Sequence, residues 1–177
     1  IRTALEDVTT NVMIADADRT IVYANRPLMK MLADVEQDLR RDLPAFDVRT
    51  VVGSSIDIFH RKPEHQARML AQLQGTHCAQ ITVGGRIMQL IINPVTDGDG
   101  QRIGYVVEWA DRTHEVMVEQ EVTRIVQAAA QGDLSGRIAE TGKQGFLLML
   151  SQQVNGLLSA IAGSVEAVSG VLQSLSK

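Results

Sequence analysis

The chain has 177 residues, of which 45% are hydrophobic and 21% charged, and its net charge is −4. This composition is typical of a globular protein with room for one ordinary domain and a smaller element. The acidic balance argues against a nucleic-acid partner, because phosphate binding needs a clustered positive surface. No uninterrupted apolar run of about 18 residues is present, so no membrane span is expected.

A single cysteine, Cys78, agrees with a reducing compartment, and we expect the chain to be cytoplasmic. The chain starts with Ile rather than Met and still has a helical pattern at Lys177. We therefore expect it to be a fragment of a longer protein. The sequence contains no nucleophile with a matching base, no P-loop and no zinc-ligand spacing, so no enzyme activity is expected.

The first hundred residues alternate between short β-type runs and turn signals. Residues 11–16 and 20–23 are joined by three residues, which is hairpin spacing. Asn25 is placed to cap a helix that has Pro27 in its first turn. A second helix is expected from Pro63 to Leu73. Three further strands, separated by Gly-rich or Asp-Gly turns, are expected at residues 78–83, 86–95 and 103–110.

This order predicts an α+β fold with one antiparallel five-stranded sheet covered on one face by helices. In the last strand, alternate residues share a face, so Trp109 is expected to point toward the helices together with Ile103, Tyr105 and Val107. The faces of the preceding strand are left open, because both of its alternating sets are largely apolar.

From Glu115 the apolar spacing becomes helical. A first helix is expected to end at Gly132-Asp133, and a second has apolar residues spaced mostly three and four apart, with two consecutive fours around Ile161. Such a seam needs a partner, and a parallel dimer forming a four-helix bundle would supply one. The seam residues are Leu147, Leu150, Val154, Leu157, Ile161, Val165, Val168, Leu172 and Leu175.

These patterns carry a resemblance to two known families. Residues 1–113 resemble a PAS domain, and Asp111-Arg112-Thr113 is similar to the D-x-T motif that ends many PAS domains. Residues 114–162 resemble a HAMP domain, because QAAAQGDLSGRI has the G-D-L connector and an apolar anchor. The proline common in the first HAMP helix and the glutamate that begins the second are missing. Residues 163–177 are expected to continue the helix toward the next signalling element.

More narrowly, IDIFHRKPEHQ and VVEWADRT resemble the haem-binding PAS domains of soluble aerotaxis-type methyl-accepting chemoreceptors. The resemblance implies that His60 ligates the iron of haem b and that Trp109 stabilises bound oxygen. It also implies that Leu90 borders the gas pocket. The partners implied are oxygen, a second copy of the chain, and a chemotaxis histidine kinase with its adaptor, reached through a downstream region.

Physical chemistry sets conditions on these roles. An axial ligand must be a neutral imidazole whose second nitrogen is hydrogen-bonded, and Ile58 and Phe59 could wall the apolar cavity beside it. His65 is a fallback ligand. An indole N–H offers a donor and no acceptor. The main alternative is a ligand-free PAS domain that dimerises and relays a signal, with Trp109 and Leu90 filling its core, and a flavin or small metabolite is a third possibility.

Overall fold

The computed structural model describes residues 2–60 and 63–175, with the side chains of residues 2, 3, 63, 65 and 66 outside the description. The chain divides into two compact units, one ending at Arg112 and one beginning at Thr113. Our expected boundary after residue 113 differs from this division by one position.

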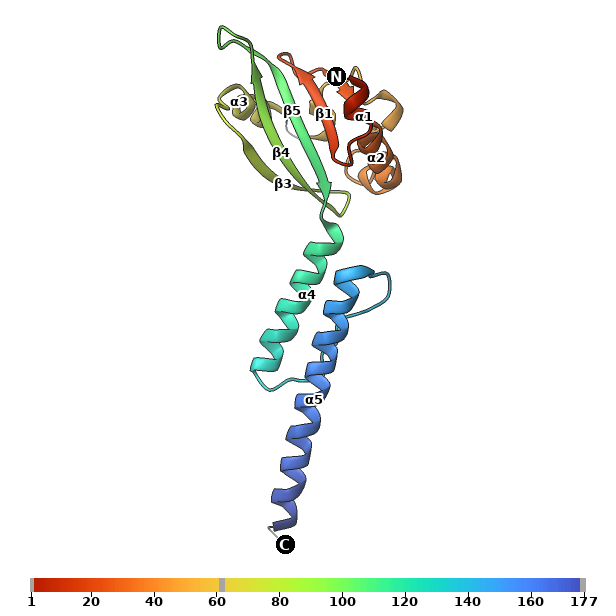
Figure 1. Cartoon of the computed structure of the whole chain (residues 1–177), viewed down its shortest axis with the longest axis vertical. Helices are drawn as coiled ribbons and strands as arrows, with labels where there is room; N and C mark the ends of the chain where they lie inside the picture. Colours follow the sequence, from red (N-terminus) through yellow and green to blue (C-terminus); the bar gives the residue numbers. More distant parts are fainter. Residues whose placement is uncertain (1, 61–62, 176–177) are drawn as a thin grey trace. The chain divides into compact units, whose positions relative to one another are not determined.

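The first unit is built on a five-stranded antiparallel sheet with the order β2-β1-β5-β4-β3 (Figure 1). The hairpin predicted near the start is confirmed, since β1 and β2 pair antiparallel. The last strand, β5, pairs with β1 and with β4 and therefore lies in the middle of the sheet. The strands are β1 (Asn11–Asp16), β2 (Ile21–Ala24), β3 (His77–Val83), β4 (Arg86–Thr96) and β5 (Arg102–Asp111).

Helical segments precede β1 and fill the connection between β2 and β3. The predicted cap is confirmed: Asn25 is fully buried, and its side chain accepts from the backbone N–H of Leu28 at 3.1 Å. The amide also bonds three backbone groups of the preceding segment, so its burial is compensated. The segments are α1 (Arg2–Glu6), α2 (Arg26–Leu39), the 3₁₀ turns η1 (Val48–Thr50) and η2 (Ile56–Phe59), and α3 (Pro63–Ala71).

The core lies between one face of the sheet and these helical segments. Tyr105, Val107 and Trp109 are buried together, as their alternation predicts. Ile103 is the exception: it is 52% exposed, and it falls at a shift in the β4–β5 register, where it has no partner on β4 and the alternation is interrupted. The structure also decides the faces of β4, where the buried set is Met88, Leu90 and Ile92.

An ionic contact marks the end of β5, where the chain continues into the second unit. Arg86 donates to Asp38 of α2 at 2.6–2.7 Å and to Asp111 at 3.3 Å. The neighbouring Gly84 packs against the end of α2 with a φ of +59°, and a Cβ there would lie 1.8 Å from the Asp38 carbonyl oxygen. The turn between β3 and β4 therefore requires glycine at this position.

The second unit consists of α4 (Thr113–Ala130), an irregular connector and α5 (Gly145–Leu175) (Figure 1). Ile125 of α4, Ile138 of the connector and Leu158 of α5 form its small core. Asn155 of α5 bonds both backbone groups of Ile138, at 2.8 and 2.9 Å. Glu121 of α4 accepts from Ala139 N–H, which contributes to lowering the pKa of this carboxyl.

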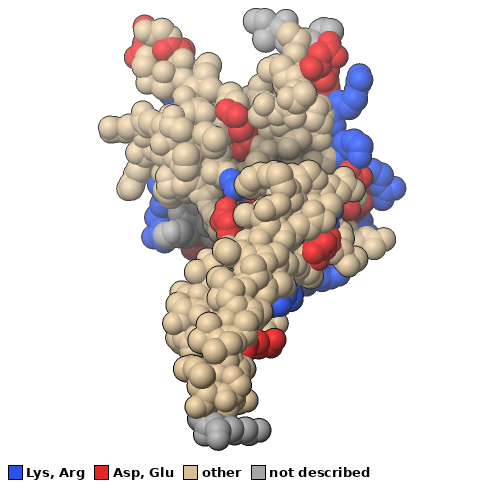
Figure 2. Space-filling view, turned by 60° about the horizontal axis from the view of Figure 1, so that its bottom comes forward, with Lys and Arg blue, Asp and Glu red and all other residues tan. Residues whose placement is uncertain are grey.

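Most of α5 beyond Leu158 leaves its apolar residues exposed, and Figure 2 shows a largely uncharged surface toward the C-terminal end. Leu157 is 61% exposed, whereas Leu158 is 5% exposed. Of the expected seam, Val154 packs against the core of the unit, and the residues from Leu157 onward are exposed. By length and composition alone, α5 is long and apolar enough to cross a membrane, whereas the sequence predicted no membrane span. One helix that meets this criterion is weak evidence for a span. The exposed seam residues are Leu157, Ile161, Val165, Val168, Leu172 and Leu175.

Candidate ligand-binding site

A small apolar cavity of about 40 Å³ lies in the core of the first unit, between the sheet and the segments η2 and α3. Among the described residues that line it, ring nitrogens come from His60 and Trp109 alone, and the one hydroxyl comes from Tyr105. The remaining lining is aliphatic, aromatic or thioether. The sheet contributes Met13, Ala15, Ile81, Leu90, Ile92, Tyr105, Val107 and Trp109, and the helical side contributes Ile56, Phe59, His60, Met69 and Leu70.

His60 follows directly after η2 and lies on the helical wall of this cavity. Its Nδ1 lies 3.1 Å from the Ile56 carbonyl oxygen. Burial lowers the pKa of His60 below its usual 6.5, and the bond to Ile56 and the charge of Asp57 only oppose this shift. A neutral imidazole facing a carbonyl must carry its proton on Nδ1. Its Nε2 is therefore left with a free lone pair, as an axial ligand requires.

Trp109 occupies the sheet wall and is 5% exposed. Its ring centroid is 4.8 Å from that of Phe59, at an interplanar angle of 55°. The indole N–H is buried and has no hydrogen-bond acceptor in the described part of the chain. Buried donors are nearly always paired, so this orphan group needs an explanation. A bound molecule with an acceptor atom would provide one.

Leu90 stands directly opposite Trp109 in the β4–β5 ladder, and both line the cavity. The position that the resemblance gave Leu90, beside the pocket, is thus where the side chain lies. Tyr105 also lines the cavity, but its hydroxyl donates to the Leu70 carbonyl of α3 at 3.3 Å. The orphan donor of the cavity is therefore the indole and not the phenol.

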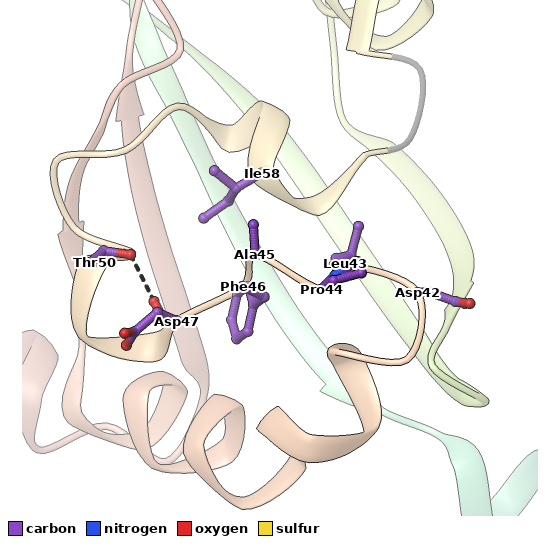
Figure 3. A pocket seen from close by; sticks show the side chains of 8 residues that line it. All are labelled: Asp42, Leu43, Pro44, Ala45, Phe46, Asp47, Thr50 and Ile58. Carbon is purple, nitrogen blue, oxygen red and sulfur yellow. Dashed lines mark hydrogen bonds between the residues drawn. The ribbon is translucent and has the colours of Figure 1, made fainter.

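Ile58 and Phe59, expected as two walls of one cavity, face different spaces. Phe59 lines the core cavity, whereas Ile58 lines a separate, open hollow of about 420 Å³ together with residues 42–47 and Thr50. In Figure 3 the Ile58 side chain points toward Ala45 of the loop that follows α2. Adjacent residues of a 3₁₀ turn diverge by about a third of a turn, which separates the two side chains.

Sequence reasoning missed the two methionines of the cavity. Met13 on β1 is 2% exposed and lies directly opposite Val107 of β5. The pairing of β1 with the last strand is the signal that could have placed Met13 beside the buried face of β5. Met69 was assigned to a helix without a role. The side chain of His65, the fallback ligand, lies outside the described residues. Cys78 is exposed, whereas a lone cysteine without a reactive environment is expected to be buried.

The donor set fits a haem, although the cavity is small. His60, with its neutral imidazole, lines an apolar space from the helical side, and Trp109, whose buried N–H has no acceptor among the described residues, lines it from the sheet. Ligand pockets usually measure about 300–1,000 Å³, so a cavity of about 40 Å³ would have to widen to admit a macrocycle. Among the described residues, no group of three or more His, Cys, Asp or Glu side chains is placed to hold a metal ion.

Comparisons with known proteins agree with this architecture. No family model matches the chain. A methyl-accepting chemotaxis protein of Pseudomonas aeruginosa, McpB, is 44% identical over all 177 residues. The Aer2 receptor from Vibrio cholerae, described as a dual PAS-heme oxygen sensor, is 33% identical in a structure with a TM-score of 0.52, which covers 58% of this chain and 94% of that one. The chain belongs to the PAS-containing chemoreceptors.

The PAS unit thus has the fold expected for it, a five-stranded antiparallel sheet with helical segments on one face. An RNA-binding light-oxygen-voltage receptor, 17% identical with a TM-score of 0.51, covers 73% of this chain and 36% of that one, and shares the fold alone. The chain spans about a quarter (26%) of the length of McpB.

Proposed function

We propose that the PAS unit binds haem b through His60 and senses oxygen on behalf of a chemoreceptor. The observation that carries the proposal is the buried indole N–H of Trp109, which has no acceptor among the described residues and belongs to a side chain that lines the same cavity as the neutral imidazole of His60. A solved relative, the Aer2 receptor, is described as a PAS-heme oxygen sensor. Haem would supply an iron centre that binds a diatomic gas.

The residues of the chain have distinct parts in this proposal. His60 would hold the iron through Nε2, with Nδ1 donating to the Ile56 carbonyl. Trp109 would donate its N–H to the gas, which favours oxygen over carbon monoxide because the acceptor atom of oxygen becomes more negative. Leu90 and Phe59 would keep the space beside the indole apolar and exclude water.

The signal would leave through the strand that carries Trp109. Only Arg112 separates the end of β5 at Asp111 from the start of α4 at Thr113. Drawing the indole toward a ligand would shift β5, and with it the ionic contact between Arg86 and Asp111. The shift would then bias a HAMP-like pair of helices between two packings.

The remaining parts of the proposal concern the whole receptor. The exposed seam of α5 fits a parallel homodimer, because it leaves one apolar stripe without cover in the described chain. The output would be a chemotaxis histidine kinase and its adaptor, reached through a region beyond this chain, in the cytoplasm. The unit itself would act without catalysing a reaction.

A carbon monoxide difference spectrum of the reduced, haem-supplied protein tests the proposal. A Soret shift is expected in the parent protein, and its loss is expected in His60→Ala. His114→Ala is the matched control, because His114 is exposed on α4. Absence of the Soret shift from the parent protein, or its persistence unchanged in His60→Ala, contradicts haem binding at this site.

The second candidate is a ligand-free PAS unit that dimerises and relays a signal. The observation that favours it is the close packing of Phe59 on Trp109 over a cavity of only about 40 Å³. This candidate predicts a colourless protein in which truncation of Trp109 lowers stability and leaves no spectrum to change. Purification with and without added haem separates the two.

A further inference from the structure

The turn between β1 and β2 lies against η2, the segment that carries His60. Arg19 of this turn has a φ of +68° and is the only non-glycine residue with positive φ in the described part of the chain. A long side chain in this region is strained, and such strain persists where the surroundings hold the residue in place. The strained residue therefore points to a local requirement.

The contacts of Arg19 show what holds it. Its carbonyl accepts from the Ile56 N–H at 2.9 Å, and its guanidinium Nη2 lies 3.2 Å from the Asp57 carboxylate. Both contacts are made to η2. The side chains of the ion pair are 33% and 25% exposed, so solvent screens the pair only in part.

The same peptide groups lead directly to the imidazole. The Ile56 unit gives its N–H to Arg19 and receives the His60 Nδ1 at its carbonyl, while the Asp57 carbonyl accepts from the His60 backbone N–H at 3.0 Å. The first turn of η2 is therefore fixed on one side by Arg19 and on the other by His60. A rotation of η2 would move the acceptor of the imidazole.

The ion pair is also incompletely satisfied. Arg19 Nε and the second Asp57 carboxylate oxygen are both buried and have no partner among the described residues. Leaving such buried polar atoms unpaired costs free energy. A pair that was optimised only for stability would use these atoms.

We propose that Arg19 and Asp57 are positioning residues that fix the tautomer and ring orientation of His60 through the Ile56 peptide. Because it concerns the imidazole that would hold haem, this proposal rests in part on the proposed function. Neither side chain lines the cavity, so both act through the backbone of η2. The pair then sets how firmly the imidazole presents Nε2 to the cavity.

Two variants separate this role from a general effect on folding. Arg19→Gly removes the guanidinium and relieves the positive φ, so the turn keeps its conformation. Asp57→Asn keeps the size of the side chain and removes its charge. The matched control is Lys30→Ala, which breaks the exposed ion pair between Lys30 and Asp34 on α2. Arg19→Lys keeps the positive charge, so it should preserve part of the parent behaviour that Arg19→Gly loses.

The first measurement needs no haem. Nitrogen-15 spectra of the neutral imidazole in the ligand-free protein should show His60 with its proton on Nδ1. Arg19→Gly and Asp57→Asn should give a mixture of both tautomers, whereas Lys30→Ala should match the parent. An unchanged tautomer ratio in both variants, or an equal change in Lys30→Ala, overturns the proposal.

The second measurement uses the haem-loaded protein and a scavenger for released haem. Outer-shell partners of a ligating histidine alter metal affinity by about 10–100-fold, and a pair one peptide further out should change haem release by about 3–10-fold. No acceleration in either variant contradicts the proposal. A parent protein that takes up no haem rejects the proposed function instead, and the tautomer result then decides the positioning role by itself.

Discussion

Phe59 and Trp109 lie with their ring centroids 4.8 Å apart, yet the indole N–H beside this contact has no acceptor among the described residues. The ring faces are well packed, while the one polar atom of the pair is unused. Packing uses only the apolar surface of the indole and gives its N–H no role. The N–H is therefore the feature of this core that a bound ligand explains and that apolar packing leaves unexplained.

Replacing Trp109 with phenylalanine should separate the donor from the ring. A hydrogen bond to a charged acceptor contributes about 1.5–3 kcal/mol, so oxygen affinity of the haem-loaded protein should fall about tenfold or more. Carbon monoxide affinity should change by less than about threefold. Phe59→Leu is the control, because it alters packing and keeps the N–H. Equal losses for both gases in Trp109→Phe would assign the residue to packing.

Stability of the ligand-free protein should depend on the protonation of His60. Burial lowers its pKa in the folded chain, so the unfolded chain binds more protons between the folded pKa and about 6.5. Stability should therefore decrease as the pH falls through this window, by at most about 1.4 kcal/mol per pH unit from this one site.

Urea unfolding of the parent protein and of His60→Asn, at several pH values between 5 and 7.5, measures the contribution. The variant should lose the part of the slope that His60 supplies. Identical slopes in the two proteins would mean that His60 is ionised alike in both states. That result would contradict the inference that burial lowers the pKa of His60 in the folded chain.

The β3–β4 turn allows a sharp comparison between two neighbouring glycines. An alanine at Gly84 would place its Cβ 1.8 Å from the Asp38 carbonyl oxygen, and one at Gly85 would meet nothing within 4 Å, although both have positive φ. Gly84→Ala should cost about 3 kcal/mol or more, and Gly85→Ala about 1–2 kcal/mol. Thermal or urea unfolding gives the difference, and equal costs would contradict this packing of the turn against α2.

The exposed seam of α5 predicts a dimer that charges should separate. Val165→Lys combined with Val168→Lys would bury two ammonium groups in an apolar interface, which is strongly unfavourable. Sedimentation should show dimers for the parent protein and monomers for the double variant. Ala167→Lys is the control, because it is exposed outside the seam. A monomeric parent protein, or loss of the dimer in the control as well, would refute the predicted interface.

Much of the PAS unit follows from patterns that are local in the sequence. Alternation in β5 is enough to bury Val107 and Trp109 on one face, and Asn25 caps α2 through a bond to a residue three positions away. The hairpin spacing acts over an equally short distance. The resemblance also named His60, Trp109 and Leu90, which the fold brings to one cavity.

Other features depend on contacts between distant segments. The strand order places β1 beside β5, and Met13 of β1 lines the cavity together with residues of β5. The turn between β1 and β2 separately brings Arg19 to η2. Ile58 and Phe59 diverge because of the local 3₁₀ geometry, but only the surrounding segments decide that Phe59 lines the core cavity and Ile58 the hollow beside the loop after α2.

The sequence by itself determined the kinds and approximate bounds of the strands and of the longer helices, because hydrophobic alternation, capping and turn residues act over a few positions. Tertiary structure alone decided that Leu158 packs in the helical core while Leu157 stays exposed, and that the Trp109 N–H is left without an acceptor. The physical reason is that burial and hydrogen-bond satisfaction are properties of a residue's neighbours in space, which no local pattern specifies.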